Sequence, residues 1–353
     1  VGAMKTLVKF CFLLCFLCLS AYSQVNENKL SLIMTGDALL HSRVYEDAKF
    51  KDKNSKTGYS YDFSKALIHL KDIISKYDLA FYNQESILGG KELGLSSYPN
   101  FNSPQEFGDE MINIGFNLVS LANNHSLDRG EKAILSSLSY WKSKPNVLTS
   151  GTYASFKERD EIQIKEKNGI KYAFLAYTYG VNNHRIPKAY LVDLIDKDKI
   201  AKDIQKIRPQ VDLVLVSLHW GNEYVFEPNK EQKDLAHFLA QQGVDIIIGT
   251  HSHYVAPIEF IDNTLVIYSL GNFISSQIGL NRRVGMLVGV DVEKKGTKIN
   301  LNNVEVELIY TYHNDDFKNF AVYPFSKLND KLLPNYHKIE EQFKKIIFKN
   351  KTL

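Results

Sequence analysis

Short apolar runs alternate with helical patterns along most of this sequence, and the alternation limits the folds available to it. An α/β layer architecture produces such a pattern, because helices cover the faces of a mostly parallel sheet. The apolar runs predict strands at residues 30–35, 79–82, 118–121, 147–149, 163–166, 172–177, 213–217, 246–248 and 264–269. The helical spacing predicts helices at residues 63–77, 104–114, 131–142, 197–207 and 230–242. The 353 residues, 44% of them hydrophobic, suffice to bury the core of one large domain.

The pattern changes after residue 285. Residues 286–312 alternate between apolar and polar side chains, which predicts strands without intervening helices, and residues 333–348 have an amphipathic helical pattern. We therefore expect a principal domain at residues 27–292. A β-rich extension at residues 293–353 would follow, with a C-terminal helix packed on it.

The N-terminal residues have the pattern of a secretory signal peptide. Met4 and two lysines lead into an apolar run at residues 10–19, and Ala21-Tyr22-Ser23 follows as a small-x-small cleavage motif. We expect cleavage before Gln24, so residues 1–23 would be removed; residues 1–3 are set aside because they precede the expected initiator. A membrane anchor is the alternative, but the run is shorter than the roughly 20 apolar residues that span a bilayer. The expected location is the periplasm or the cell surface.

Cysteine and charge content narrow the chemistry further. The three cysteines, Cys11, Cys15 and Cys18, all lie in the expected signal peptide, so the mature protein would contain neither a disulfide nor a thiolate site. The 43 basic and 40 acidic residues nearly balance, which argues against a general nucleic-acid-binding surface. We therefore expect no nucleic-acid partner.

Polar residues directly follow five of the predicted strands. These residues are Asp37, Glu85, Asn124 with His125, His219, and His251 with His253. The carboxyl ends of strands in an α/β sheet form the edge where sites assemble. Imidazole, carboxylate and amide oxygen together suit Zn, Mn or Fe. The pattern therefore predicts a divalent-metal site, although a single strand-end histidine such as His219 is more often a structural residue.

The histidine pair in Gly249-Thr250-His251-Ser252-His253 is the strongest part of this set. On an extended segment, residues i and i+2 point to the same side. We therefore expect His251 and His253 to face one site from an extended continuation of the strand.

Longer motifs contain these residues. They are Gly36-Asp37 with His41, Asn83-Gln84-Glu85, residues 122–130 (ANNHSLDRG), residues 219–223 (HWGNE), residues 249–253 (GTHSH) and residues 268–273 (YSLGNF). In this order, over roughly residues 30–291, they resemble the CapA family of poly-γ-glutamate and capsule-synthesis proteins. That family is similar to calcineurin-like metallophosphoesterases. The resemblance implies a four-layer α/β/β/α sandwich with two divalent cations.

The resemblance also implies roles for individual residues. The metal ligands would be Asp37, Glu85, Asn124, His219, His251 and His253. His125 would donate a proton to the leaving oxygen, and Asp37 and Glu85 would join it as catalytic residues.

This sequence departs from the phosphoesterase pattern at two points. Leu39 stands where the histidine of Asp-x-His is expected, so His41 would serve as a ligand only if its loop turned inward. The Gly-Asp-x-x-Asp motif is also absent, which leaves Glu85 as the candidate bridge between two cations.

Other residues are candidates for substrate contact. They are Arg129, Tyr179, Asn182, Trp220 and Glu223. Aromatic residues such as Trp220 either line a cleft or pack in the core. Arginines, including Arg185 and the pair Arg282-Arg283, either bind anionic groups or remain solvated surface charges.

Three functions follow from these observations. The leading hypothesis is an exported metal-dependent hydrolase that acts on a phosphoester or a polyanionic cell-envelope polymer. The second is a non-catalytic accessory or polymer-binding component of capsule or poly-γ-glutamate synthesis and export, working in a membrane capsule-synthesis complex. The third is an enzyme that cleaves the amide bonds of γ-linked glutamate.

Overall fold

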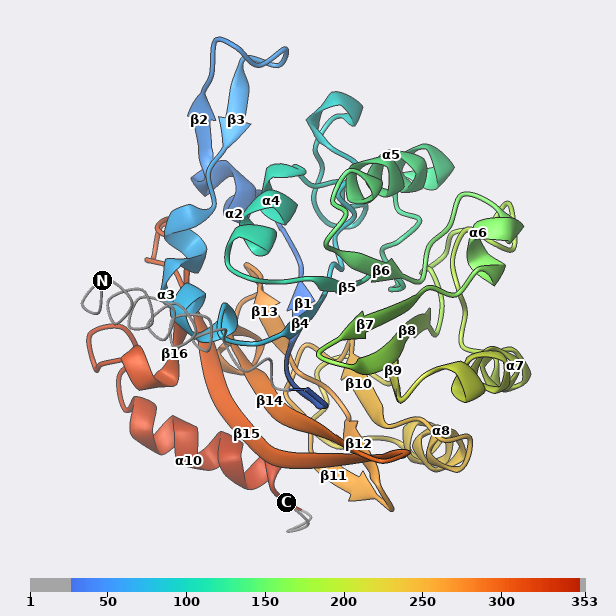
Figure 1. The fold of residues 1–353 in the computed structure, drawn as a ribbon. Coiled ribbons are helices and arrows are strands. Elements are labelled where there is room, and N and C mark those ends of the chain that lie inside the picture. The colour runs from blue at the N-terminus through green and yellow to red at the C-terminus, as the bar shows by residue number, and fades with distance from the viewer. Residues whose placement is uncertain (1–26, 350–353) are drawn as a thin grey trace, which may run out of the picture.

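The computed structural model describes residues 27–349, and Figure 1 shows their path. The expected signal peptide, with its cysteines, lies outside the described residues. No helix in the described part of the chain is long and apolar enough to cross a membrane.

Two large sheets organise residues 27–349 (Figure 1). The first has the strand order β16-β15-β14-β1-β4-β5-β6, with β13 beside the end of β1. Its strands are β1 (Lys29–Ala38), β4 (Leu79–Asn83), β5 (Leu118–Ser120), β6 (Leu148–Ser150), β13 (Asn272–Ile274), β14 (Val284–Lys295), β15 (Lys298–Tyr312) and β16 (Ala321–Pro324). The strands from β1 to β6 in this order run parallel, whereas β14, β15 and β16 pair antiparallel.

The second sheet has the order β11-β12-β10-β9-β8-β7. Its strands are β7 (Ile164–Lys167), β8 (Ile170–Thr178), β9 (Leu213–His219), β10 (Ile246–Thr250), β11 (Ile258–Ile261) and β12 (Thr264–Ile267). The four central strands run parallel, and the edge strands β7 and β11 are antiparallel to their neighbours.

Helices connect the strands of the two sheets or follow the last of them. They are α2 (Ser42–Asp47), α3 (Ser64–Ile74), α4 (Glu106–Asn113), α5 (Gly130–Lys142), α6 (Phe156–Asp160), α7 (Lys197–Ile207), α8 (Lys230–Gln241), α9 (Leu280–Arg283) and α10 (Tyr336–Ile347). A small hairpin, β2 (Lys49–Lys51) with β3 (Tyr59–Tyr61), projects from the body in Figure 1.

Three apolar clusters lie between these layers in the described residues. One cluster fills the space between α3, α4, α5 and the first sheet, and a second lies between the two sheets. The third lies between the second sheet and α7 and α8. The structure therefore confirms the predicted α/β/β/α sandwich.

Local sequence explains the helices on the second sheet. In α7, Ile200, Ile204 and Ile207 recur at helical spacing and are buried, and the side chain of Asp196 caps the first turn by accepting the Lys199 amide. In α8, Asn229 and Gln232 form a capping box. Because these signals are local, the predicted ranges match the observed helices closely.

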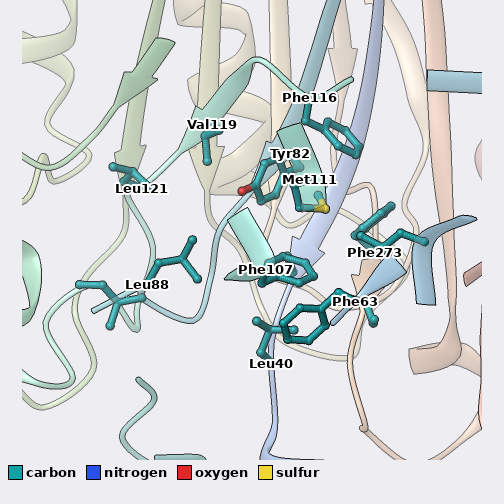
Figure 2. Packing of buried hydrophobic residues seen from close by; sticks show 14 of the residues in the cluster. Leu40, Phe63, Tyr82, Leu88, Phe107, Met111, Phe116, Val119, Leu121 and Phe273 are labelled. Carbon is teal, nitrogen blue, oxygen red and sulfur yellow. The ribbon is translucent and has the colours of Figure 1, made fainter. Parts of the chain in front are cut away.

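An aromatic group in the first cluster anchors two strands that lead to the site (Figure 2). The ring of Phe116 packs edge-on against Tyr82 and Phe273, with centroid distances of 5.1 and 5.6 Å. Tyr82 precedes Asn83 at the end of β4, and Phe273 follows Asn272 at the start of β13. Core packing thus holds both asparagines in place.

The C-terminal segment enlarges the first sheet. β14 runs across residue 292 to Lys295, and β15 pairs with it along most of its length. α10 contributes Phe343 and Ile347 to the cluster between the sheets. The division of the chain into domains at residue 292 stays a prediction.

Candidate metal centre

The end of β1 presents Asp37 between the two sheets. Oδ1 of Asp37 accepts a hydrogen bond from Nδ2 of Asn83 at 2.8 Å, and Oδ2 accepts one from the backbone amide of His251 at 3.1 Å. The preceding Gly36 permits this position, because a Cβ there would lie 1.7 Å from the carbonyl oxygen of Gly271. The close approach of the two backbones brings Asp37 next to residues from the second half of the chain.

Glu85 lies just beyond β4 and is fully buried. Its amide donates to the carbonyl of Ala38 at 3.2 Å, which ties this turn to the end of β1. Neither carboxylate oxygen has a hydrogen-bond partner. Oε1 lies 3.6 Å from Nε2 of His219, and Oε2 lies 3.8 Å from Nδ1 of His253. Buried carboxylate oxygens without hydrogen bonds within the protein are available as ligands for a cation.

The histidine pair reaches the site in a different way from the one expected. β10 ends at Thr250, and His251 and His253 have φ values of 94° and 57°. The prediction of an extended segment is therefore wrong, because the chain turns through left-handed conformations directly after the strand. Both imidazoles are nevertheless buried at the site, with Nδ1 of His251 3.1 Å from Nε2 of His219.

Two overlapping groups of ligand atoms result. One comprises Glu85, His219 and His251, and the other comprises Asp37, Glu85 and His253; within each group the candidate atoms lie within 4.8 Å of one another. Oδ1 of Asn124 adds an amide oxygen 2.9 Å from Nε2 of His219. Nitrogen and oxygen donors of this kind suit divalent cations, and Glu85 is the residue common to both groups.

The close packing of these ionisable groups shifts their pKa values. Burial and the neighbouring Asp37 raise the pKa of Glu85 well above its usual value. Burial, together with the neighbouring imidazoles, lowers the pKa of His219 well below its usual value and that of His251 to about 3. Burial also acts to lower the pKa of His253, but the carboxylates of Glu85 and Asp37 outweigh it and raise that pKa to about 9. The neutral imidazoles of His219 and His251 can act as ligands, whereas His253 must first lose a proton.

His125 lies on one wall of the site and is oriented by a buried carboxylate. Its Nδ1 is 2.7 Å from Oδ2 of Asp128, which also accepts the amide of Phe101 at 2.6 Å. The ring of Phe101 packs edge-on against His125 at a centroid distance of 4.7 Å. With Nδ1 engaged, Nε2 is the nitrogen left for contact with a ligand.

A cavity of about 600 Å³ opens over these residues. Its lining includes His125, Asn124 and His253 from the site and Tyr98, Asn182, His184, Glu223 and Tyr224 from the surrounding loops. Cavities of this size accommodate small molecules or segments of a polymer.

The structure separates the predicted substrate contacts into two sets. Asn182 and Glu223 line the cavity, and the exposed ring of Tyr179 lies 4.6 Å from that of His251. Trp220 is instead 2% exposed in the core beside Tyr268, and its Nε1 donates to the Tyr268 carbonyl at 3.0 Å. This position corrects the expectation that Trp220 contacts substrate.

Arg129 also does not line the cavity. Its Nη1 donates to the carbonyl of Gly94 at 3.0 Å and to the hydroxyl of Ser96 at 2.7 Å, while Nη2 donates to Leu93 at 3.1 Å. Arg129 therefore supports the loop at residues 93–96, which corrects its assignment as a substrate contact.

His41 turns toward the cavity but lies outside both ligand groups. Its Nδ1 is 3.1 Å from the carbonyl of Leu39, and its ring packs edge-on against Phe101 at 5.2 Å. Burial lowers the pKa of His41 to about 4. Leu39 itself is buried in the cavity wall at the position of the missing histidine.

Three residues of the site escaped prediction as functional residues. Asn83 donates a hydrogen bond to Asp37, and Oδ1 of Asn272 lies 2.9 Å from Nδ1 of His253. Asp128 orients the ring of His125. Asn83 is the last residue of β4 and Asn272 is the first residue of β13, and both lie within motifs noted in the sequence. Their positions at strand ends were the signal that could have identified them. The i, i+3 spacing of His125 and Asp128 was the signal for the third.

Comparisons with known proteins agree with this architecture. Residues 31–277 match the family described as "Bacterial capsule synthesis protein PGA_cap". The PGA biosynthesis protein CapA of Bacillus subtilis (strain 168) is 30% identical over 186 residues, which are 52% of this chain and 49% of the relative. The capsule biosynthesis protein CapA of Bacillus anthracis is 28% identical over 281 residues, which are 77% of this chain and 66% of the relative. The matches thus span about half to two thirds of these relatives' lengths.

A solved structure shares the fold. The calcineurin-like phosphoesterase YfkN from Bacillus subtilis aligns with a TM-score of 0.50 and 13% identity, covering 90% of this chain and 99% of the solved chain. The fold is therefore metallophosphoesterase-like. Because the family match runs over more than half of its length, this chain belongs to the family of bacterial capsule synthesis proteins.

Proposed function

We propose that the protein is an exported, metal-dependent hydrolase that acts on a phosphoester or a polyanionic polymer of the cell envelope or capsule. The observation that carries the proposal is the position of Glu85. Both of its oxygens are buried without hydrogen bonds, and it belongs to both candidate ligand groups, one of which includes His253 in the wall of the cavity. A purely structural carboxylate in such a place would leave a large desolvation cost without compensation.

The ligand groups would hold two cations of the Mn, Zn or Fe type. Asp37, Glu85 and His253 would hold one, and Glu85, His219 and His251, with Asn124 nearby, would hold the other. Divalent cations in such a site supply Lewis acidity toward an oxygen-bearing substrate group.

The residues around the ligands would bind and orient the substrate. Asn182 lines the cavity, and its Oδ1 accepts a hydrogen bond from Nδ2 of Asn124 at 3.3 Å. This position would allow Asn182 to form a hydrogen bond with a substrate oxygen. His125 would transfer a proton at Nε2 to the leaving oxygen. Asp128 would hold the ring in place and complement the charge of its protonated form.

Metal analysis combined with a hydrolysis assay tests the proposal. The purified protein should retain divalent metal and hydrolyse p-nitrophenyl phosphate or bis(p-nitrophenyl) phosphate, and Glu85→Gln should lower both metal content and turnover. The screen should also include teichoic-acid-like polymers and poly-γ-glutamate, because cleavage of the latter alone would identify an amide-bond enzyme. A folded sample that binds no divalent metal would refute the proposal.

A second candidate is a non-catalytic, polymer-binding accessory in capsule or poly-γ-glutamate synthesis, working with a membrane complex. The apolar Leu39 in the cavity wall, at the position of a histidine in the phosphoesterase pattern, supports it. Polymer binding that survives replacement of His251 and His253, together with no turnover, would favour this candidate.

Export is supported by the apolar run at residues 10–19 and the small residues that follow it. The intact mass of the protein secreted by its native host should correspond to a chain that starts at Gln24. A lipid-sized mass increment on Cys15 or Cys18 would contradict this expectation.

A further inference from the structure

A second cavity, of about 420 Å³, adjoins the cavity over the metal centre. We call it the arginine annex; it is lined by His41, Ser42, Arg43, Ser97, Ser276, Gln277, Ile278 and Arg282. His41 and Gln277 line both cavities, so the two spaces are neighbours. The lining contains two guanidinium groups and three hydroxyl groups, but no carboxylate.

The two arginines of the annex are not neutralised within the described part of the chain. Arg43 lies over the ring of Phe317 at 3.7 Å, and Arg282 lies over the ring of Tyr224 at 4.0 Å, but neither forms an ion pair with a carboxylate among residues 27–349. Nη1 of Arg282 donates to the carbonyl of Ile278 at 3.1 Å, whereas its Nε is buried without a partner. Arg282 therefore has donors to offer, and an unpaired buried donor is costly unless a ligand satisfies it.

The annex is also tied to the metal centre through hydrogen bonds. Nδ2 of Asn272 donates to Oε1 of Gln277 at 2.9 Å and to the carbonyl of Arg282 at 2.8 Å, while Oδ1 of the same side chain lies 2.9 Å from Nδ1 of His253. The ring of Tyr224 lies between the two sites, 5.7 Å from His253 and beside Arg282. These contacts hold the annex at a defined position relative to the metal ligands.

We propose that the arginine annex binds an anionic oxygen group, carboxylate or phosphate, on a polyanionic chain whose neighbouring unit occupies the metal cavity. The inference deepens the proposed function, because it gives the substrate a repeating negative charge and a direction across the two cavities. Guanidinium groups suit this task because their donors match the paired oxygens of carboxylate and phosphate. Serine hydroxyls from three different segments add further donors to the same space.

Binding measurements separate this inference from hydrolysis. The metal-loaded protein is titrated with penta-γ-glutamate, with inorganic pentaphosphate and with the uncharged α-carboxamide form of penta-γ-glutamate, and affinity is measured by calorimetry. Arg43→Gln and Arg282→Gln should each weaken binding of the preferred anionic pentamer by about tenfold. The matched control is Lys345→Gln, which removes one positive charge from the exposed face of α10. Whichever pentamer binds more tightly identifies carboxylate or phosphate as the group recognised.

Two results would overturn the inference, and a third would separate it from the hydrolase proposal. If Arg43→Gln and Arg282→Gln weaken binding no more than Lys345→Gln does, or if neither anionic pentamer binds, the inference is overturned. Arg43 is exposed, and its side chain forms no hydrogen bond with residues 27–349, so its variant remains informative even if Arg282→Gln loosens the loop at residue 278. Arginine-dependent binding without any turnover would retain the annex while refuting the hydrolase proposal.

Discussion

Oδ2 of Asp128 lies 2.7 Å from Nδ1 of His125, in a pair that is almost fully buried at the wall of the metal cavity. A buried carboxylate in this position sets both the orientation and the tautomer of the imidazole. Because Asp128 follows His125 by one helical turn in the same loop, the pair forms locally. The direction of the His125 ring toward the cavity depends on the packing of Phe101 against that ring.

The first prediction concerns this pair. Asp128→Asn preserves the shape but removes the negative charge, so kcat for the hydrolysis of an aryl phosphate should fall by about 100-fold. Metal content should not change, because Asp128 belongs to neither ligand group. Steady-state kinetics with metal analysis of the same sample checks this. Unchanged kcat would remove His125 from the proton transfer.

The second prediction tests Glu85 as the proposed bridge between two cations. Glu85→Gln is nearly isosteric but removes the anion shared by the two ligand groups, so bound metal should fall from about two ions per chain to at most about one. Chelation of the metal should lower Tm in the parent protein by more than it does in the variant, because the parent loses more binding free energy. Equal metal content in the two proteins would show that Glu85 is not a bridge.

The third prediction uses the backbone of His251. With φ at 94°, this position suits glycine better than alanine, so His251→Ala should be less stable than His251→Gly by about 1 kcal/mol. Both variants should lose metal equally, because both lack the imidazole. Denaturant unfolding and metal analysis test the two parts separately. Metal loss in only one variant would indicate that backbone strain, rather than the ligand, controls occupancy.

The fourth prediction is that metal affinity rises with pH. Without a cation, the neighbouring carboxylates of Glu85 and Asp37 raise the pKa of His253 to about 9, so His253 carries a proton near pH 7 that a cation must displace. The raised pKa of His253 stabilises the folded protein without metal at low pH, and this stabilisation is lost as pH rises from about 6.5 to about 9. The Tm difference between the metal-loaded and metal-free forms should therefore widen across this interval. A difference that narrows would contradict these protonation states.

The fifth prediction concerns the junction of β1 and β13. Gly36→Ala places a Cβ against the Gly271 carbonyl, so the free energy of unfolding should fall by at least about 2 kcal/mol and Asp37 should lose its alignment. Gly180→Ala is the control, because nothing lies within 4 Å of a Cβ at that position. Chemical unfolding of both variants provides the comparison. Equal stability would mean that the two backbones separate at little cost.

The sequence patterns by themselves determined the α/β class and the edge at which the site assembles, whereas the order of the four layers was implied by the resemblance to the CapA family. Predictions succeeded where the signal is local: residues 197–207 are bounded as expected, because Asp196 caps α7 and its isoleucines recur at helical spacing. The strand-end positions of Asp37, Glu85 and His219 likewise follow from runs of a few residues. The short strand β13 was not predicted as a separate element, because three residues carry little periodicity and its pairing partner β1 lies far away in the sequence.

Only the tertiary structure decided which polar side chains meet. Asp37 and the amide of His251 form a hydrogen bond across 214 residues, and the left-handed turn after β10 directs the imidazoles inward. The tertiary structure also places Trp220 in the core and makes Arg129 a hydrogen-bond donor to the loop at residues 93–96, although their motifs had suggested substrate contacts. The physical reason is that the direction of a side chain beyond a strand end depends on contacts between distant segments. Local propensity and periodicity do not encode those contacts.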